Sequence, residues 1–413
     1  MVTYPKDWDI VALGTKCEIT SSKRVFESEW EKHGIPFLRT RDIASFHAGE
    51  EQKDKLFISE KTYREKTAVS GEPHKGDLLV TGVGTIGLPY LVPSDDKMYF
   101  KDGNILWIKK SDAFVPEYLF LQFLSKETIE QIQGGSGFTT VGTFTIKNAK
   151  KLSMPMPCTK EQEAIAETLK VFDTHIANLT EVIEKKKAIR DGALADLMSG
   201  RTRLAGYQQD WITVPFGEYF TLLGNNTYAR EQLSEHGNIG NIHYGDILVK
   251  YGNIVSERDE IPRLKEGVTF SEKWLLQETD VLIADTAEDE TVGKAIQIGK
   301  ISYPIVGGLH TIVCRPNMKT ASGFLGYYIN SRAFHDQLLP HITGIKVSSV
   351  SKKAIKTTEL RIPSDMEEQE AITGVLATMD DDIKTLEEER NKMIQIREGA
   401  MDDLLTGRVR LAV

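Results

Sequence analysis

The chain has 413 residues, with 51 Lys and Arg against 60 Asp and Glu, and this acidic balance of −9 argues at first sight against a nucleic-acid-binding protein. Three scattered cysteines, without a CxxC or His-rich context, argue against a disulfide framework and against a zinc or other metal site. No signal peptide opens the chain and no apolar run approaches the roughly 20 residues that span a bilayer, so we expect a cytoplasmic protein.

Residues 1–158 have the pattern of a mixed α/β region. Short apolar runs between turn residues predict strands, and a periodic apolar run predicts a helix from Pro116 to about Gln133. The predicted strands are Ile35–Leu38, Asp77–Val80 and Ile105–Ile108. A region of this length can bury a core of its own.

One turn of this region matches a cofactor fingerprint. Gly82-Val-Gly-Thr-Ile-Gly87 is a literal GxGxxG sequence, but Pro89 and Pro93 prevent the helix whose N-terminus would hold a phosphate. We therefore expect either a plain hairpin turn or a close backbone approach to DNA. Because no Walker A loop or methyltransferase motif occurs, we expect no catalysis by this chain and no cofactor bound to it.

A long internal repeat follows the first region. Glu161-Gln-Glu-Ala-Ile165 recurs 207 residues later as Glu368-Gln-Glu-Ala-Ile372, and the copy continues to Gly200-Arg-Thr-Arg-Leu-Ala205 and Gly407-Arg-Val-Arg-Leu-Ala412. Of 45 aligned positions, 22 are identical. Chance does not produce this agreement, so each copy should build the same structural unit.

Both copies carry an apolar heptad pattern, which predicts a helix of close to 39 residues in each copy and a coiled-coil seam. Thr159 and Ser364 are placed as N-caps, and Gly200 and Gly407 follow the last periodic residues. The seam residues, which we also expect to bind partner chains, are Ile165, Leu169, Phe172, Ile176, Leu179, Ile183, Ile372, Leu376, Met379, Ile383, Leu386 and Leu404.

The connection between the two helices favours an antiparallel pair, because a globular region joins the end of the first to the start of the second. Such a pair would hold the two globular regions at opposite ends. The alternative is that each helix packs only on its own region. Charged seam residues toward the C-terminal halves (Lys186, Arg190, Arg390 and Arg397) suggest that another chain contributes there.

The second region, residues 206–363, opens with a weaker repeat. Tyr4, Asp7, Trp8, Val11 and Gly14 match Tyr207, Asp210, Trp211, Val214 and Gly217 at an offset of 203. We predict strands at Gly245–Val249, Asp280–Ile283 and His310–Val313, a turn at Glu290–Lys294, and a helix from near Ser322 through Phe334. The scaffold thus repeats while its loops differ.

The acidic excess is concentrated at the end of the chain. Residues 364–413 carry 13 acidic and 6 basic residues, whereas residues 1–158 carry 21 of each kind. Much of the excess lies in Asp380–Asp382 and Glu387–Glu389. Such a run marks either a solvated helix face or an interface with a basic partner.

These patterns predict an α+β protein with a pseudo-twofold internal repeat. Two mixed α/β domains, residues 1–158 and 206–363, are separated by two long helices, within residues 159–205 and 364–413, that form an antiparallel coiled coil. The same plan with different loops suits a recognition device with two parts.

With these features the chain resembles the specificity subunit of a type I restriction-modification system. The resemblance covers the whole chain and rests mainly on the duplicated Glu-Gln-Glu-Ala-Ile helix and its Gly-Arg-x-Arg-Leu ending. Weaker support comes from Pro36–Asp42 and Ile242–Asp246, which lie at equivalent places early in the two regions.

The resemblance implies a partner role in DNA modification. Each variable region would be a target-recognition domain that reads one half of a bipartite site in double-stranded DNA. The helices would act as the spacer and as the docking surface for two modification (methyltransferase) subunits, which would bind S-adenosylmethionine and methylate adenine. A restriction or translocase subunit could join them.

Arg and Lys donate to guanine edges, and Ser and Thr donate to bases and phosphates. On this basis we select candidate DNA contacts in both regions, each of which could instead be an ordinary surface or partly buried residue. In the first region they are Arg39, Thr40, Arg41, Lys75, Thr85, Lys101, Thr139, Thr140 and Lys147. In the second they are His243, Tyr244, Lys250, Thr291, Lys294, His310, Lys346 and Ser348.

Two other functions remain open at this point. A coiled-coil scaffold with two adaptor domains would share the repeat but would not bind DNA in the presence of its partners. An enzyme using the GxGxxG turn would bind a labelled cofactor by itself.

Overall fold

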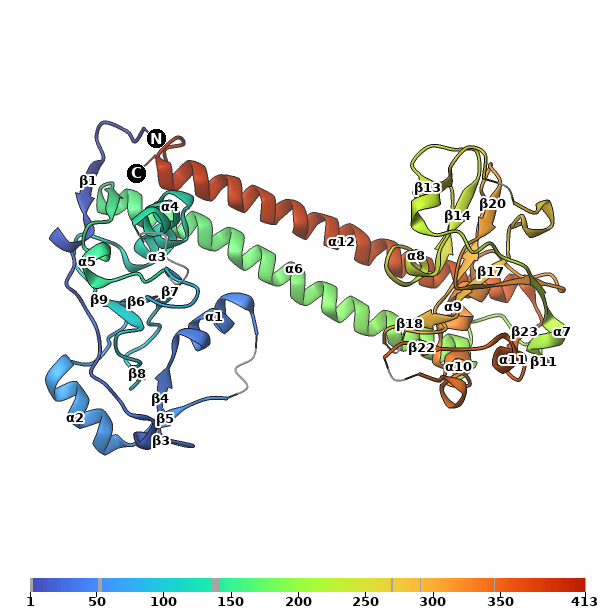
Figure 1. The fold of residues 1–413 in the computed structure, drawn as a ribbon, viewed down its shortest axis with the longest axis horizontal. Helices are drawn as coiled ribbons and strands as arrows, with labels where there is room; N and C mark the ends of the chain where they lie inside the picture. Colours follow the sequence, from blue (N-terminus) through green and yellow to red (C-terminus); the bar gives the residue numbers. More distant parts are fainter. Residues whose placement is uncertain are drawn as a thin grey trace. The chain divides into compact units, whose positions relative to one another are not determined.

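The computed structural model describes residues 3–50, 54–135, 142–268, 270–289, 291–344 and 346–412. Its contacts divide the chain into two units. The first unit comprises residues 1–180 and 388–413, and the second comprises residues 181–387. Figure 1 labels the elements of both. Each unit therefore contains a globular region and a length of both repeated helices.

The first unit has two four-stranded sheets and a two-stranded ribbon. One sheet is antiparallel, in the order β2 (Ile19–Thr20), β9 (Ile105–Ile108), β6 (Leu78–Thr81) and β7 (Pro89–Leu91). The other has the order β3 (Trp30–Glu31), β5 (Phe57–Ile58), β4 (Ile35–Leu38) and β8 (Tyr99–Phe100). The ribbon pairs β1 (Asp9–Ala12) with β10 (Ser153–Met156). The helices are α1 (Thr40–Ala48), α2 (Glu60–Ser70), α3 (Pro116–Leu124), α4 (Lys126–Gly135), α5 (Ile146–Ala149) and part of α6 (Thr159–Ser199).

The second unit repeats this plan with one strand more in its main sheet. That sheet has the order β12 (Phe220–Leu223), β21 (Thr311–Pro316), β17 (Val281–Ala284), β19 (Ala295–Ile298) and β15 (Ile254–Val255). A second sheet has the order β13 (Leu233–Ser234), β16 (Arg263–Leu264), β14 (Gly240–Ile242) and β20 (Ile305–Gly307). Two ribbons pair β11 (Trp211–Pro215) with β23 (Glu359–Pro363) and β18 (Thr286–Ala287) with β22 (Ser348–Ser349).

The helices of the second unit are mostly short, apart from the repeated one. They are α7 (Phe216–Tyr219), α8 (Tyr244–Val249), α9 (Phe324–Asn330), α10 (Arg332–His335), α11 (Lys352–Ile355) and part of α12 (Met366–Thr406). Single 3-10 turns across the two units are Leu13–Thr15, Glu27–Glu29, Arg230–Gln232, Glu272–Trp274 and Leu339–His341. Among the helices that the structure describes, none is both long and apolar enough to cross a membrane.

The predicted helices of the globular regions are present but interrupted. The helix expected from Pro116 to Gln133 breaks at Ser125, whose backbone is extended and whose hydroxyl accepts the N–H of Thr128 to cap α4. The helix expected over residues 322–334 breaks at Ser331 between α9 and α10. A serine that can bond to its own backbone offers an alternative to continued helix in both places.

The predicted strand Gly245–Val249 is wrong, because residues 244–249 form α8. His243 caps this helix, and the Asp246 carboxylate accepts the His243 backbone N–H at 3.1 Å. Ile247 is buried whereas Val249 is 89% exposed, so the apolar run does not lie against one sheet face. The local capping interactions decide the conformation here.

The two repeated helices, α6 and α12, have 41 residues each and are followed by Gly200 and Gly407, both with φ of +72°. Glycine tolerates this left-handed conformation at a helix C-terminus. The N-caps differ from expectation by one residue. Asp365, not Ser364, caps α12 by accepting the Glu367 N–H at 2.9 Å, and Thr159 is already the first residue of α6.

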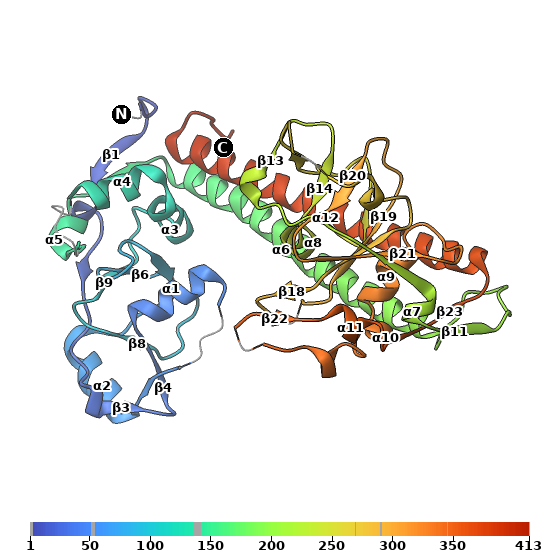
Figure 2. The same cartoon turned by 45° about the vertical axis from the view of Figure 1, so that its right-hand side comes forward.

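In each unit α6 and α12 run side by side and antiparallel (Figures 1 and 2). In the first unit Arg397 lies 3.0 Å from Asp173. In the second, Lys186 lies 3.0 Å from Asp382, and Arg190 lies 3.1 Å from Asp380. Lys186, Arg190 and Arg397 therefore have acidic partners on the facing helix, so their charges are balanced within the chain and do not by themselves indicate a contribution from another chain. Part of the acidic run at 380–389 is used in the same way, because Glu387 also pairs with Lys187 at 2.8 Å.

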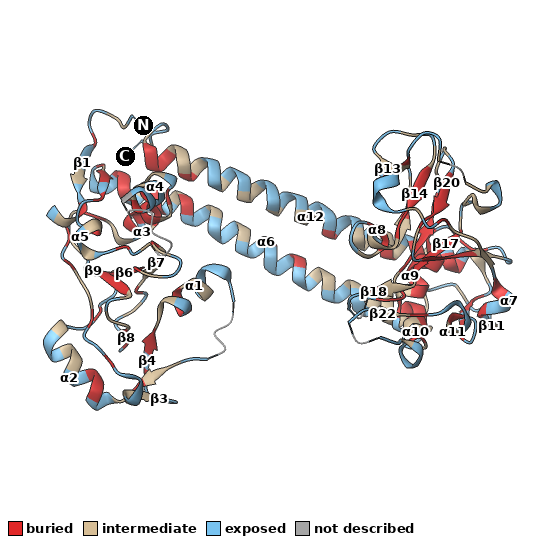
Figure 3. Ribbon diagram, viewed as in Figure 1, coloured by how far each residue is buried: buried red, intermediate tan, exposed pale blue. Residues whose placement is uncertain are grey.

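Buried positions occur along both long helices, at their ends in the globular regions and between them (Figure 3). Ile165, Leu169 and Leu404 belong to the core of the first unit, and Ile372 and Leu376 belong to that of the second. Leu179, Ile183 and Ile383 are buried as well, whereas Phe172, Ile176, Met379 and Leu386 are half-buried. The helices therefore pack both on each other and on the globular regions.

Candidate nucleic-acid interface and helix junctions

The first glutamate of each repeated motif forms a buried junction with the end of the other long helix. Glu161 accepts hydrogen bonds from the Trp8 indole at 3.1 Å and from Arg410 at 2.5 and 2.8 Å. Glu368 accepts them from the Trp211 indole at 3.4 Å and from Arg203 at 2.8 and 2.6 Å. Both residues are at most 2% exposed. The duplicated Glu, Trp and second Arg of Gly-Arg-x-Arg are thus one contact made twice.

Neighbouring residues extend each junction. Arg410 also binds Asp7 at 3.0 and 2.8 Å, and its hydrogen bonds lower the pKa of the Asp7 carboxyl. The Gln162 side chain accepts the Val115 N–H at 2.8 Å and donates to the carbonyl of Pro157. Gln369 does the same with the Ala321 N–H and the Pro363 carbonyl. The helix starts are therefore fixed to the globular regions by side chains that the sequence repeats.

A strand-to-helix corner in each unit carries some of the predicted DNA contacts. In the first unit β4 leads into α1, and in the second β14 leads into α8. Each of these strands pairs in parallel with a partner, β8 or β20. The residue before each helix is Arg39 or His243, and its backbone N–H is accepted by Asp42 or Asp246. The two corners are equivalent, but they carry different side chains.

Four of the residues selected in the first region lie at the first of these corners. The Arg39 guanidinium is bound by Asp42 at 2.8 and 2.9 Å and by the Asp54 carbonyl at 2.6 Å. Thr40 begins α1, and Arg41 is exposed, with its side chain 3.6 Å from Asp54. Lys101 donates its backbone N–H to the carbonyl of Leu38. Arg39 is thus held internally, whereas Arg41 is available to a ligand.

The other selected residues of the first region lie elsewhere. Thr85 is exposed in the hairpin turn between β6 and β7, so the GxGxxG sequence is a hairpin turn that no helix follows. Lys75 is exposed beside Asp95, and Lys147 is exposed on α5. Thr139 and Thr140 lie outside the described residues.

In the second unit, an aromatic cluster occupies the equivalent corner. The Tyr244 ring lies near the rings of His243 and His310, with centroid distances of 4.5 and 5.3 Å. Burial lowers the pKa of His243, whose neutral Nδ1 accepts the Gly245 N–H at 3.2 Å. Exposed His310 has a φ of +55° and lies 3.1 Å from Asp285.

Ser348 also lies near this aromatic cluster. It pairs with Ala287 in the β18–β22 ribbon, and Ala287 follows Asp285, the partner of His310, by two residues. Exposed Lys346 precedes this ribbon, and Thr291 is bound to Asp289 in an exposed turn. The ammonium of Lys294 instead donates to the carbonyls of Leu248 and Tyr251 at 3.0 Å, and burial lowers its pKa. Lys294 therefore fixes the end of α8.

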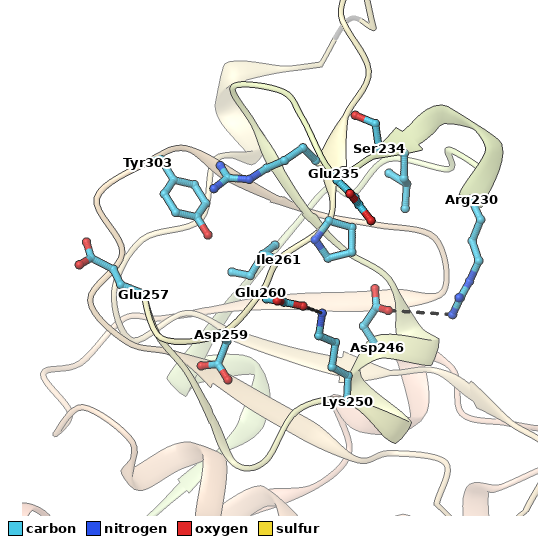
Figure 4. A pocket seen from close by; sticks show the side chains of 13 residues that line it. Arg230, Ser234, Glu235, Asp246, Lys250, Glu257, Asp259, Glu260, Ile261 and Tyr303 are labelled. Carbon is cyan, nitrogen blue, oxygen red and sulfur yellow. Dashed lines mark ion pairs between the residues drawn. The ribbon is translucent and has the colours of Figure 1, made fainter. Parts of the chain in front are cut away.

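A hollow of about 730 Å³ lies beside this corner (Figure 4). The Arg263 guanidinium lies 3.5 Å from the centre of the Tyr303 ring, and exposed Lys250 lies 3.7 Å from Glu260. The carboxylates around it are Glu235, Asp246, Glu257, Asp259 and Glu260, against the cations Arg230, Lys250 and Arg263. This excess of acidic groups disfavours a phosphate inside the hollow. Sequence reasoning missed Arg263 and Tyr303, because only the sheet pairing brings these distant residues together.

No group of three or more His, Cys, Asp or Glu is placed to hold a metal ion within the described ranges.

The family described as the type I restriction modification DNA specificity domain matches the chain twice, over residues 5–188 and 208–395. The chain belongs to this family. A putative type I restriction enzyme specificity subunit, MjaX, of Methanocaldococcus jannaschii is 21% identical over 430 residues, covering 98% of this chain and 95% of the relative. A putative subunit of Haemophilus influenzae is 28% identical over 173 residues, which cover 42% of each chain.

Solved structures of the family have the same fold. The S subunit from M. genitalium matches with a TM-score of 0.55 at 15% identity, covering 98% of this chain and 96% of that one. The HsdS subunit from Thermoanaerobacter tengcongensis gives 0.51 at 16% identity, covering 98% of each chain. Two repeated α/β regions with two long helices are therefore the architecture of this family member, as the sequence predicts.

Proposed function

We propose that this specificity subunit reads a bipartite site in double-stranded DNA, with one half recognised by each globular region. The observation that carries the proposal is the pair of equivalent strand-to-helix corners, where one scaffold presents Arg41 in the first unit and Tyr244 with His310 in the second. Sequence readers place hydrogen-bonding side chains on a rigid element and vary them between sites. A shared scaffold with different side chains suits two half-sites of different sequence.

The long helices have two roles in this proposal. They act as a spacer, because half-site separation follows protein geometry, and they dock two methyltransferase subunits. The two globular regions are nearly neutral in charge, so we infer that the partner subunits supply much of the phosphate neutralisation. We also infer that the chain itself neither methylates nor cleaves DNA and binds no cofactor, and that S-adenosylmethionine binds to the methyltransferase subunits. A restriction subunit completes the nuclease.

The test is an exchange of regions in cells. Residues 1–158 are replaced by the first region of a relative, and the methylated sequence is determined by methylation sequencing of genomic DNA. One half of the site should change while the other half and the spacing stay the same. A change in both halves would contradict independent reading.

The alternative of an adaptor scaffold is distinguished by a gel-shift assay with the assembled complex. We expect the complex to shift DNA containing its site more strongly than DNA with one half-site scrambled. A scaffold would shift neither.

A further inference from the structure

The two units differ at one edge of their main sheets. In the second unit, β15 runs parallel to β19 and covers its edge, with the Gln297 N–H donated to the Asn253 carbonyl at 2.9 Å. The Gly299 N–H is donated to the Val255 carbonyl at 2.8 Å. The first unit has the corresponding sheet β2-β9-β6-β7, but β7 is its last strand.

The register shows which backbone groups are left open. Leu91 lies opposite Leu78 in the first unit as Gln297 lies opposite Val281 in the second. Two residues earlier, the carbonyl is capped in both units. The Pro89 carbonyl lies 2.6 Å from His47 Nε2, and that of Ala295 accepts from Asn330 at 2.7 Å. By contrast, Leu91 forms a non-hydrogen-bonded pair with Leu78, because the Val92 N–H is donated to the Asp77 carbonyl and the Thr81 N–H to the Leu88 carbonyl. The Leu91 N–H therefore points away from β6 and has no partner among the described residues.

A hollow of about 440 Å³ adjoins this edge in the first unit. Its apolar lining consists of Leu91, Val115, Phe120, Leu121 and Ala166, contributed by β7, α3 with the residue before it, and α6. Val115 and Ala321 are equivalent, because each donates its N–H to the repeated glutamine, Gln162 or Gln369.

The same place in the second unit is filled by β15. Ile254 of β15 packs against Gly323 and Thr373. Gly323 corresponds to Glu117 of the hollow in the first unit, and Thr373 corresponds to Ala166. The first unit thus has the groove and the strand edge, while the second unit shows the kind of segment that fits them: an extended strand with a branched apolar residue.

The rim of the hollow defines the charge of an occupant. Four carboxylates, Glu117, Glu163, Glu167 and Asp173, surround it, against the single cation Lys170. Asp173 is paired with Arg397 and Glu167 with Lys170, whereas Glu117 and Glu163 have no ion-pair partner within the described residues. A basic segment complements this rim.

We propose that β7 and this hollow, together called the β7 groove, bind an extended segment of a partner polypeptide by strand addition. The segment runs parallel to β7, accepts the Leu91 N–H with a backbone carbonyl, and places a branched apolar residue beside Ala166. Lys or Arg residues flank it and face Glu117 and Glu163. Strand addition gains affinity from main-chain hydrogen bonds and specificity from the pockets for alternate side chains. This binding goes beyond the proposed DNA reading and does not depend on it.

The test uses a labelled synthetic peptide with the sequence of residues 250–258, the segment that fills the equivalent place in the second unit, carrying Glu257→Gln. Its fluorescence anisotropy is followed as the full chain is added. We expect saturable binding. Leu91→Pro removes the open N–H, and because an edge position tolerates proline the chain should still fold. Its affinity should fall roughly tenfold. Ala166→Phe should fill the hollow and weaken binding independently of the edge.

Two controls make the result interpretable. The peptide with Ile254→Asp should not bind, and Glu163→Lys should weaken binding of the basic peptide while thermal unfolding of the chain stays unchanged. Equal binding to the original chain and to Leu91→Pro would overturn the proposal, because the peptide would then sit elsewhere, for instance in place of β15. No binding at millimolar peptide would overturn it too. Self-association of the chain that Leu91→Pro abolishes would assign the groove to a second copy instead.

Discussion

At the scale of single residues, the duplicated motifs are explained by two buried carboxylates. Removing a carboxylate from water is costly unless charged and hydrogen-bonding partners surround it. Glu161 and Glu368 each have an arginine and an indole N–H as donors. A change in either partner leaves the carboxylate buried, so the Glu, Trp and Arg positions constrain one another.

The first prediction compares the two arginines of Gly200-Arg-Thr-Arg-Leu. Arg203→Met should lower the free energy of unfolding by about 3 kcal/mol or more, because the Glu368 carboxylate remains buried without its charge partner. Arg201→Met is the matched control, since its pair with Asp196 is exposed and should contribute under about 1 kcal/mol. Urea unfolding followed by circular dichroism measures both. Equal losses would contradict the assignment of the junction.

The second prediction separates two arginines of the β4–α1 corner. Arg41→Ala should weaken specific DNA binding of the assembled complex roughly tenfold and leave stability nearly unchanged, because this side chain is exposed. Arg39→Ala should mainly lower stability, since its guanidinium is bound by Asp42 and Asp54. Gel-shift titrations at fixed salt and thermal unfolding distinguish the two effects. If Arg39 rather than Arg41 governs binding at unchanged stability, the corner is assigned wrongly.

At the scale of elements, the sequence predicts the long helices well because a heptad pattern and a terminal glycine act locally. It also places β4 and β9 correctly, since short β-branched and aromatic runs between turn residues are distinctive. It fails at residues 244–249, where the apolar run resembles a strand and the deciding cap is a histidine. The partners of Arg190 and Arg397 could not be foreseen, because the sequence predicts an antiparallel pair of helices but not which residues face each other across it.

The third prediction concerns the helix seam. Leu179→Asp places a charge at a position that is 8% exposed and should destabilise the chain by about 3 kcal/mol or more or prevent assembly with its partners. Leu386→Asp should have a smaller effect, because Leu386 is half-buried. Val171→Asp, on the same helix and 59% exposed, is the control. Thermal unfolding and gel filtration with the partner subunits give the comparison, and similar behaviour of all three variants would argue against a buried seam.

At the scale of the whole molecule, the fourth prediction tests the helices as a spacer. Seven residues inserted after Thr180 in α6 and seven after Glu387 in α12 keep both heptad registers and lengthen each helix by about 10 Å. The half-sites should then move apart by about three base pairs, at roughly 3.4 Å per step. The same insertion in α6 alone mismatches the pair and should abolish modification. Methylation sequencing reads the spacing, and an unchanged spacing in the double insertion would refute the spacer.

Sequence patterns give the two-region architecture of the molecule and the repeated helices, but only part of the candidate interface. Arg39 and Arg41 are found because they follow a predicted strand, and His243 and Tyr244 because they lie in the equivalent segment early in the second region. Arg263 and Tyr303, brought together by β16, β14 and β20, are not. The exposure of individual side chains could not be predicted from the sequence either. Lys294 looks like a surface lysine in the sequence, but its ammonium donates to two backbone carbonyl groups.

The junction at Glu161 has a consequence for synthesis of the chain on the ribosome. Its partner Arg410 is 249 residues later in the chain, and residues 388–413 belong to the first unit. The second unit is one continuous stretch, residues 181–387, and its own Glu368 partner, Arg203, has already been made when Glu368 emerges. Domains made first usually fold first. In this chain the unit that is translated first is completed last, so a polypeptide that stops before Arg410 has its structural defect in the N-terminal unit.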